Sequence, residues 1–222
     1  MSTEENMSNL NIAILMWYDN DTAERFGNIS YKINKLYCDK HGYNIIFSNE
    51  RKHKDNHWEK IPLVLNNIKN YDYVIWIDAD AHFYIDSGPI SALIKNYPDK
   101  DIILSGDIGI TLDKQKDNIN TGVFIVKNTK EAIEIMERWC NDEYLYNLNI
   151  VNWDQGVLRK MYNNNILDIN NYSVVVPYGV LQHFDLTEKY NIKPYINHLA
   201  GSFKYEIVEV FSKYLDYILN KN

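Results

Sequence analysis

The stretch Tyr73-Val74-Ile75-Trp76-Ile77-Asp78-Ala79-Asp80 carries the strongest structural signal in the sequence. Its five apolar residues predict a buried strand, and two acidic residues follow directly. Residues two apart on a strand point to the same side, so both carboxylates can face one point in space. The stretch therefore predicts a central strand that ends in a polar site.

Strand-like and helix-like segments alternate along the rest of the chain. Further strands are expected at 11–17, 43–48, 102–105, 122–126 and 173–176, and helices at 24–41, 58–68, 130–145, 154–162 and 203–219. This alternation predicts an α/β fold with a mostly parallel central sheet flanked by helices. In such a sheet ligands bind at the carboxyl ends of the strands, so polar residues after the apolar runs are the first candidates. The apolar side of the last helix fits core packing better than a membrane surface.

Composition narrows the function classes. The 222 residues include 23 basic and 30 acidic ones, a net charge of -7, which disfavours a general nucleic-acid binder. The longest apolar run, Ile12–Tyr18, is far shorter than the ~20 residues of a membrane span, and the acidic residues before it argue against a signal peptide. Cys38 and Cys140 form no disulfide framework or metal-site spacing. These features lead us to expect a soluble cytoplasmic protein with no transmembrane segment.

Residues 1–9 are expected to be disordered, and 10–222 to form a single domain without linkers or repeats.

Asp78 and Asp80 are the leading ligand candidates. Two convergent carboxylates suit a hard divalent cation, which in turn can hold a diphosphate. The same spacing occurs at Asp19/Asp21 and at Asp99/Asp101. The last pair precedes a strand and is typical of a solvated turn, whereas the first follows a strand and competes as a ligand site. For Asp78 and Asp80 themselves, the alternative is a cap on the segment 81–86.

The stretch around Asp78 and Asp80, together with several others that follow one another in the expected order, resembles glycosyltransferase family 34. The galactosyl-, mannosyl- and xylosyltransferases of that family have a GT-A fold. The resemblance spans about residues 11–205. The matching stretches are 37–43, 57–62, 71–81, 120–124, 153–155 and 198–204, with Trp139 closing one of the helices. The GT-A domain, a Rossmann-like nucleotide-diphospho-sugar transferase fold, is thus the expected form of the α/β sheet.

The resemblance implies a nucleotide-sugar donor and a manganese ion, with magnesium as a second possibility. Asp78 and Asp80 match the family's Asp-x-Asp metal motif, and His198 matches the histidine that completes the site. Two carboxylates and one imidazole also suit manganese on chemical grounds. The alternative for His198 is a hydrogen-bonded structural histidine.

The resemblance also implies contacts to the donor. Gln155 matches the residue beside the reacting anomeric carbon and Asp154 its sugar-binding neighbour, while Trp153 stands where plant members carry a further acidic residue. Lys204 lies one residue further from the histidine than in the family's pattern. The candidate donor-binding residues are Trp17, Tyr18, Asp19, Trp58, Lys60, Ala79, Asn120, Gly122, Gly201 and Lys204.

Some of these residues have simpler explanations. Trp58 could be core packing and Lys60 a solvated charge. Asp154 and Gln155 could form a plain helix cap. Gly201 could be a turn residue.

The expected function is metal-dependent, retaining transfer of a hexose or pentose to a glycan or other hydroxyl acceptor. A UDP-sugar is favoured over GDP-mannose as the donor. Because Gln155 is neutral, we expect a front-side displacement rather than a covalent intermediate. A sugar nucleotidyltransferase is the alternative, but it usually carries an early Gly-rich loop that residues 18–22 lack. A second alternative is a catalytically weak, carbohydrate-binding GT-A relative.

Overall fold

The computed structural model describes residues 10–53, 55–107, 118–141, 153–186 and 194–221. A six-stranded sheet with the order β2-β1-β3-β6-β5-β7 lies at its centre. Its strands are β1 (Ile12–Trp17), β2 (Asn44–Ser48), β3 (Tyr73–Ile77), β5 (Ile102–Gly106), β6 (Ile119–Lys127) and β7 (Ser173–Val176). All the predicted strands are confirmed, although β6 starts earlier than 122. The disorder expected for 1–9 concerns residues outside the described ranges.

Strand directions confirm a mostly parallel sheet with one exception. β1 runs parallel to both β2 and β3, and β5 runs parallel to β7. β6 is antiparallel to β3 and to β5. Its first residues therefore reach the edge at which β1 and β3 end. The reversal adds Asn120 and Gly122 to the strand-end site, where apolar patterning alone places only the residues that follow β1 and β3.

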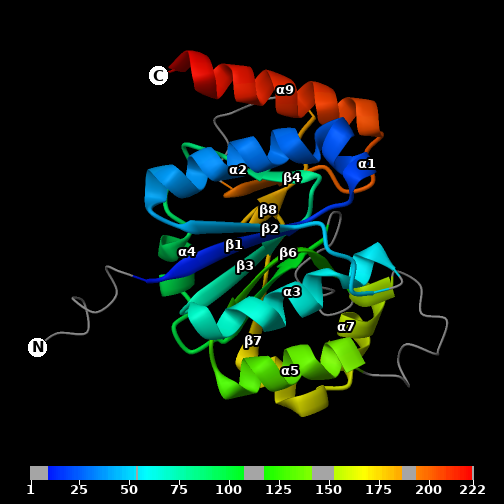
Figure 1. Ribbon diagram of the computed structural model, residues 1–222. Coiled ribbons are helices and arrows are strands. Elements are labelled where there is room, and N and C mark those ends of the chain that lie inside the picture. The colour runs from blue at the N-terminus through cyan, green and yellow to red at the C-terminus, as the bar shows by residue number, and fades with distance from the viewer. Residues whose placement is uncertain (1–9, 54, 108–117, 142–152, 187–193, 222) are drawn as a thin grey trace, which may run out of the picture.

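Helices cover both faces of this sheet (Figure 1). One face packs against α3 (Lys60–Asn67), α5 (Lys130–Asn141), α7 (Trp153–Asn163) and α8 (Ile169–Tyr172). The other packs against α2 (Asn28–His41) and α4 (Ser91–Lys95). β3 is buried along its whole length because both faces are covered, as its unbroken apolar run predicts. The helix expected at 130–145 is described as far as Asn141; the rest lies outside the described residues.

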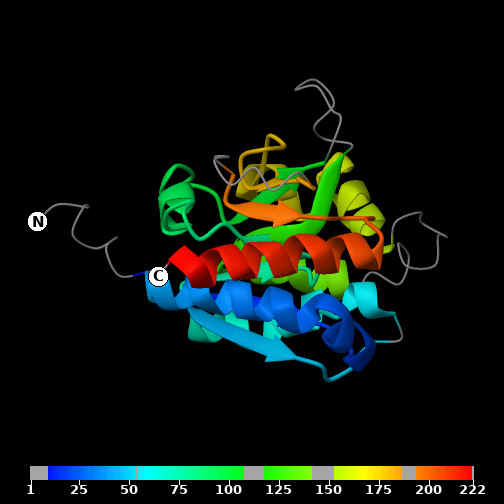
Figure 2. The ribbon, with the colours of Figure 1, turned by 90° about the horizontal axis from the view of Figure 1, so that it is seen from above.

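A second, three-stranded sheet was not predicted. It has the order β4-β9-β8, with β4 (Ala81–Phe83), β8 (Gln182–His183) and β9 (Ile196–His198). α9 (Lys204–Lys221) lies over β4 and alongside α2 (Figure 1; Figure 2). Strands of two or three residues that carry polar side chains fall below any periodic signal. Their pairing has a functional consequence, since Ala81 lies opposite His198 and brings that histidine beside Asp80.

The C-terminal helix confirms the predicted core role. Ile207, Val210, Phe211, Tyr214 and Ile218 are all buried in a cluster with Phe26, Ile33 and Leu199. No helix in the described parts of the chain has the length and apolar character needed to cross a membrane.

The helix predicted at 24–41 starts differently. A short turn α1 (Asn20–Thr22) and a π-helical segment η2 (Ala23–Gly27) precede α2. Short 3-10 segments, η3 (Asn56–Trp58) and η4 (Ile68–Asn70), flank α3, and η6 (Ile166–Asp168) precedes α8.

Candidate donor and metal site

Asp78, Asp80 and His198 converge on one point. Each offers one ligand atom, and these atoms all lie within 4.8 Å of one another. Within the described ranges, no second group of three such side chains comes together, so neither of the competing Asp pairs forms part of one. The donor set, two carboxylates and one imidazole, fits a divalent cation such as Mn²⁺.

Backbone contacts fix this trio. The Asp78 N–H donates to the Gly122 carbonyl at 2.8 Å, and the Asp78 carbonyl accepts from Ala81 at 3.1 Å, which turns the chain from β3 into β4. The Asp80 carbonyl accepts from the Leu199 N–H at 2.9 Å. These bonds tie the acidic turn to both sheets. The two carboxylates belong to that turn and do not cap a helix over 81–86.

Two polar partners of the trio were missed by sequence reasoning. Gln182 on β8 holds the His198 ring, with Nδ1 2.9 Å from Oε1. Because this oxygen accepts, Nδ1 carries a proton, and the other ring nitrogen, Nε2, faces Asp80 at 3.3 Å. Trp76 Nε1 donates to Asp78 Oδ1 at 2.6 Å. Outer partners of this kind orient metal ligands. Gln182 comes from a distant strand, so only the folded topology shows it, whereas Trp76 lies on β3 two residues before Asp78.

Lys60 is a buried cation behind the trio. Its side chain is 5% exposed, so its interpretation as a solvated charge is wrong. The ammonium lies 3.2 Å from Asp154 Oδ2, 3.4 Å from Asp78 Oδ1 and 3.2 Å from the Thr121 carbonyl. Burial alone would lower the pKa of Lys60, but the two carboxylates outweigh it and raise the pKa. The amine is therefore charged and positions both carboxylates, since a lysine has three donors and all three have an oxygen within reach.

The pKa values of the three candidate ligands shift in different directions. Burial raises the pKa of the Asp78 carboxyl, although Lys60 opposes the shift. Burial acts on Asp80 as well, but the charge of His198 and its hydrogen bond lower the pKa of Asp80 overall. The Asp80 charge in turn outweighs burial and raises the pKa of His198. Neighbouring carboxylates that repel one another are stabilised by a positive charge placed between them.

The first turn of α7 faces the start of β6. Gln155 Oε1 accepts from the Thr121 N–H at 3.1 Å, and Asp154 Oδ2 accepts from Thr121 Oγ1 at 2.8 Å. The buried Asp154 also pairs with Lys60, so its carboxylate is part of the site rather than a plain helix cap. Thr121, which the motif pattern did not single out, is the residue that joins these two to the strand.

Asn120 and Gly122 flank Thr121 on β6, and Gly122 contacts the trio. The Asn120 Oδ1 accepts from the Gly122 N–H at 2.9 Å, and the pairing of β5 with β6 is irregular between Leu104 and Ser105, next to Asn120. Bulges commonly occur beside active sites, where they redirect side chains. Gly122 packs directly against the His198 ring, where no side chain would fit.

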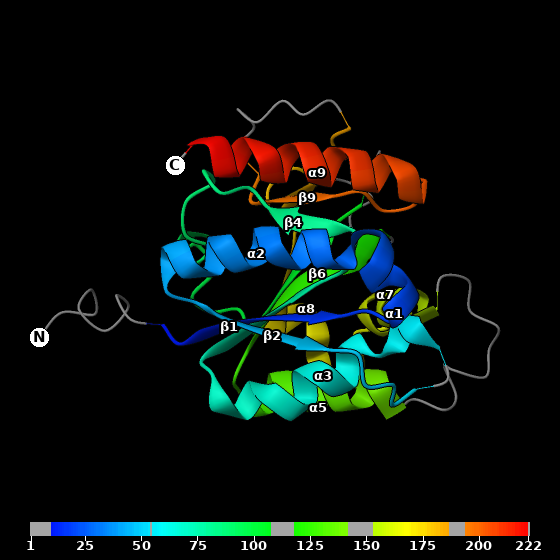
Figure 3. The same ribbon diagram turned by 45° about the horizontal axis from the view of Figure 1, so that its top comes forward.

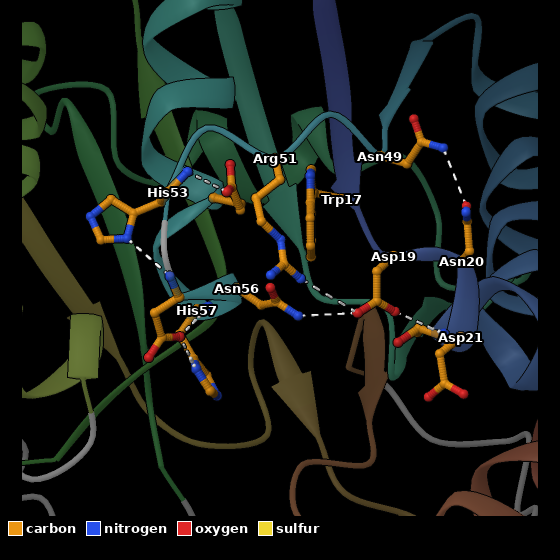
Figure 4. A network of polar contacts seen from close by, with 12 residues as sticks. Trp17, Asp19, Asn20, Asp21, Asn49, Arg51, His53, Asn56 and His57 are labelled. Atoms are coloured by element: carbon orange, nitrogen blue, oxygen red, sulfur yellow. Dashed lines mark hydrogen bonds and ion pairs between the residues drawn. The ribbon is translucent and has the colours of Figure 1, made fainter.

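Three of the candidate donor-binding residues, Trp17, Tyr18 and Asp19, lie at the end of β1, where we expect the base and ribose of the nucleotide. Trp17 is buried and donates from Nε1 to the Glu50 carbonyl at 2.9 Å. Tyr18 is buried as well and packs on Phe47 with ring centroids 4.3 Å apart. Asp19 remains accessible: it accepts from the Thr22 N–H and from Asn56 Nδ2 at 3.1 Å, with Arg51 at 4.0 Å (Figure 4). The loop is therefore ordered by its own polar contacts.

The remaining donor candidates come from three segments of the chain: the turn after β3, η3, and the residues from β9 to the start of α9. Ala79 is the partly buried residue between the two aspartates, and Trp58 is core-packed at the end of η3. Gly201 has a φ of +76°, the left-handed conformation that glycine adopts most readily. Lys204 is exposed and lies 3.3 Å from Asp21 Oδ2. In two views, α1, α7 and the first turn of α9 lie at the same edge of the molecule (Figure 1; Figure 3).

An open α/β sheet whose central strand ends in two aspartates facing a histidine defines a protein of the GT-A class. Two solved structures share the fold. A glycosyltransferase involved in the glycosylation of the major capsid of PBCV-1 is 19% identical, covers 91% of this chain and 99% of its own, and has a TM-score of 0.70. The galactosyltransferase LgtC, solved with donor and acceptor sugar analogs, is 11% identical over 92% of this chain and 95% of its own, with a TM-score of 0.54.

The chain belongs to the nucleotide-diphospho-sugar transferase family, which it matches over residues 11–205. A curated relative, galactomannan galactosyltransferase 1 of Cyamopsis tetragonoloba, is 28% identical over 111 residues, which cover 47% of this chain and 25% of the relative. These matches confirm the resemblance to glycosyltransferase family 34. The chain spans about a quarter of the length of that relative.

Proposed function

We propose that this protein transfers a sugar from a nucleoside-diphosphate sugar to a hydroxyl group of a glycan or other acceptor. One observation carries the proposal: Asp78, Asp80 and His198 place their ligand atoms within 4.8 Å of one another at the strand-end edge of a family member. Gln155 and Asp154 are joined to the same edge through Thr121. A metal-diphosphate site and a sugar site thus lie side by side.

Asp78, Asp80 and His198 would hold the cation, for which we propose Mn²⁺, with Mg²⁺ as the second choice. When bound, the cation neutralises the charge that grows on the leaving diphosphate. Lys60 keeps Asp78 and Asp154 in place, and Gln182 keeps the Nε2 atom of His198 directed at the site. UDP is the nucleotide that we favour. Asp19 is the accessible side chain at the end of β1 and would contact its ribose.

For the transfer itself we propose a front-side displacement with retention of anomeric configuration. The bond from the anomeric carbon to the phosphate oxygen breaks, and a bond to the acceptor oxygen forms on the same face. The acceptor proton passes to the departing phosphate. Gln155 carries no charge and so cannot form a stable covalent intermediate; its amide oxygen would stabilise the positive charge that develops at the carbon.

A panel of UDP- and GDP-sugars, incubated with Mn²⁺ and without acceptor, tests the proposal through the nucleoside diphosphate that is released. We expect metal-dependent release from at least one donor. NMR of the first sugar formed then tests the stereochemistry. An inverted anomer would exclude the front-side route, and binding of Mn²⁺ and UDP without any turnover would favour a carbohydrate-binding protein over an enzyme.

A further inference from the structure

Trp153 and His57 form an exposed, plane-to-plane stack at the rim of the site. The two ring centroids are 4.1 Å apart and the planes differ by 3°. Trp153 is 52% exposed, whereas the four other tryptophans of the chain, Trp17, Trp58, Trp76 and Trp139, are between 1% and 8% exposed. A large aromatic ring left in water next to a polar site calls for an explanation, because exposed apolar area commonly marks a binding surface.

The stack is held rigidly from its histidine side. Asp55 Oδ1 lies 2.6 Å from His57 Nδ1 and also accepts from the His57 N–H at 3.0 Å. The neighbouring Asn56 is tied to Asp19 at the end of β1 (Figure 4). The His57 ring is thus fixed to the loop that borders the predicted nucleotide site.

The stack is also held from its tryptophan side. Trp153 has a φ of +45°, an uncommon backbone conformation for a bulky residue. The next residue, Asp154, is anchored through its side chain to Lys60 and through its carbonyl to Trp139 Nε1 at 2.9 Å. Backbone strain of this kind persists where the surroundings enforce it, and it clusters at ligand sites. The exposed indole face is therefore presented in one orientation.

Trp153 lies at the start of α7, two residues before Gln155, the residue that we place beside the reacting carbon. The cation site and the loop after β1 account for the diphosphate and the nucleoside. What remains is the incoming hydroxyl, and a flat, rigid aromatic surface suits the apolar C–H face of a pyranose ring. Rigid aromatic side chains provide contact area at a low cost in conformational entropy.

Building on the proposed function, we infer that the Trp153–His57 stack is an acceptor platform on which a pyranose ring of a carbohydrate acceptor lies. This makes Trp153 a specificity-determining residue for glycoside acceptors. An acceptor hydroxyl without a sugar ring, such as that of a serine side chain, would gain nothing from the stack.

Tryptophan fluorescence gives a direct test, because Trp153 is the tryptophan that acrylamide can reach. With Mn²⁺ and UDP bound, methyl β-D-glucopyranoside, methyl β-D-galactopyranoside, methyl α-D-mannopyranoside and lactose are titrated in turn. We expect at least one of them to protect Trp153 from quenching in a saturable way, and Trp153→Ala to abolish the protected signal. Leu219→Ala, a change at another exposed apolar residue, serves as the control and should keep it.

Kinetics with the protecting sugar as acceptor supply a second readout. Trp153→Ala should raise the acceptor KM about tenfold, which corresponds to about 1.4 kcal/mol, while Trp153→Phe should recover most of the loss. The donor KM should change much less than the acceptor KM.

Two results would overturn the platform: no protection by any of these sugars, or protection by a UDP-sugar alone, which would assign the stack to the donor. Either can occur while Mn²⁺ and UDP still bind and the donor is still hydrolysed. Failure of the platform is thereby distinguished from failure of the proposed function.

Discussion

The Cα atom of Gly122 lies against the His198 imidazole so closely that a Cβ atom would overlap the ring. The backbone of β6 therefore sets how near the histidine comes to Asp80. Gly122→Ala should push the ring away and weaken Mn²⁺ binding about 10- to 100-fold, the effect expected when the surroundings of a metal ligand are disturbed. Titration of the protein with Mn²⁺, followed by the EPR signal of the free ion, measures this.

Gly88→Ala is the matched control for this change. Gly88 has a φ of +82° with open space around its Cα atom, so alanine there costs backbone strain without touching the site. It should lower the free energy of unfolding by about 1 kcal/mol and leave Mn²⁺ affinity unchanged. If Gly122→Ala binds Mn²⁺ as tightly as the wild type, His198 is not a ligand.

Asp80→Asn tests the metal site from the carboxylate side. The backbone carbonyl of Asp80 still accepts from Leu199, so the turn is kept while the ligand charge is lost. We expect Mn²⁺ affinity to fall more than about 100-fold, beyond the cost of losing an outer contact, and metal-dependent donor hydrolysis to disappear. Asp86→Asn alters a carboxylate paired with Lys221 at 2.6 Å and should change neither. Undiminished hydrolysis by Asp80→Asn would remove Asp80 from the site.

Strand positions and the two acidic residues of the site were predictable because the signal is local. An unbroken apolar run followed by Asp78 and Asp80 is visible in eight consecutive residues. The direction of β6 was not predictable, because an apolar run looks the same in both directions. The polar start of β6 at Asn120 and Thr121 also resembles a loop. The short strands β4, β8 and β9 gave no periodic signal, so the resemblance alone indicated the place of His198.

The burial of Lys60 and its pairing with two carboxylates could not be predicted from the sequence either. Its two carboxylate partners lie 18 and 94 positions further along the chain, and no spacing rule links such residues. Unpaired carboxylates at a buried strand end repel one another, so Asp78 and Asp80 require a positive charge nearby. That physical requirement was right, but which lysine meets it depends on how α3 and α7 pack against the sheet.

Removing the Lys60 charge should destabilise the fold. Lys60→Met leaves the Asp154 and Asp78 carboxylates buried without their cation, and we expect the free energy of unfolding to fall by about 3–5 kcal/mol in urea titrations. Adding Asp154→Asn should restore part of this, because the amide keeps a partner in Thr121 without the charge. Lys213→Met, at a surface pair with Glu209, should cost less than about 0.5 kcal/mol. Equal losses for both lysines would show that the buried ion pairs contribute nothing to stability.

The thiol of Cys38 makes stability depend on alkaline pH. Cys38 is fully buried with Sγ 3.8 Å from the Asn44 carbonyl, and burial raises its pKa to about 12, from 9.0 when exposed. The unfolded chain releases this proton above about pH 9 while the native protein keeps it. The stability that the protonated thiol contributes is therefore complete below pH 9 and is lost as the pH rises toward 12.

Urea unfolding of the wild type and of Cys38→Ala at pH 8 and about pH 10.5 measures the effect. The stability advantage of the wild type over Cys38→Ala should shrink by about 2 kcal/mol between these pH values. The higher pH lies about 1.5 units above the pKa of the unfolded thiol, and each unit is worth about 1.36 kcal/mol. Tyrosine ionisation is common to both proteins and cancels in the difference. Cys140→Ala, at a thiol that is only partly buried, should show a smaller change. A constant difference for Cys38→Ala would mean that the native thiol ionises as readily as the unfolded one.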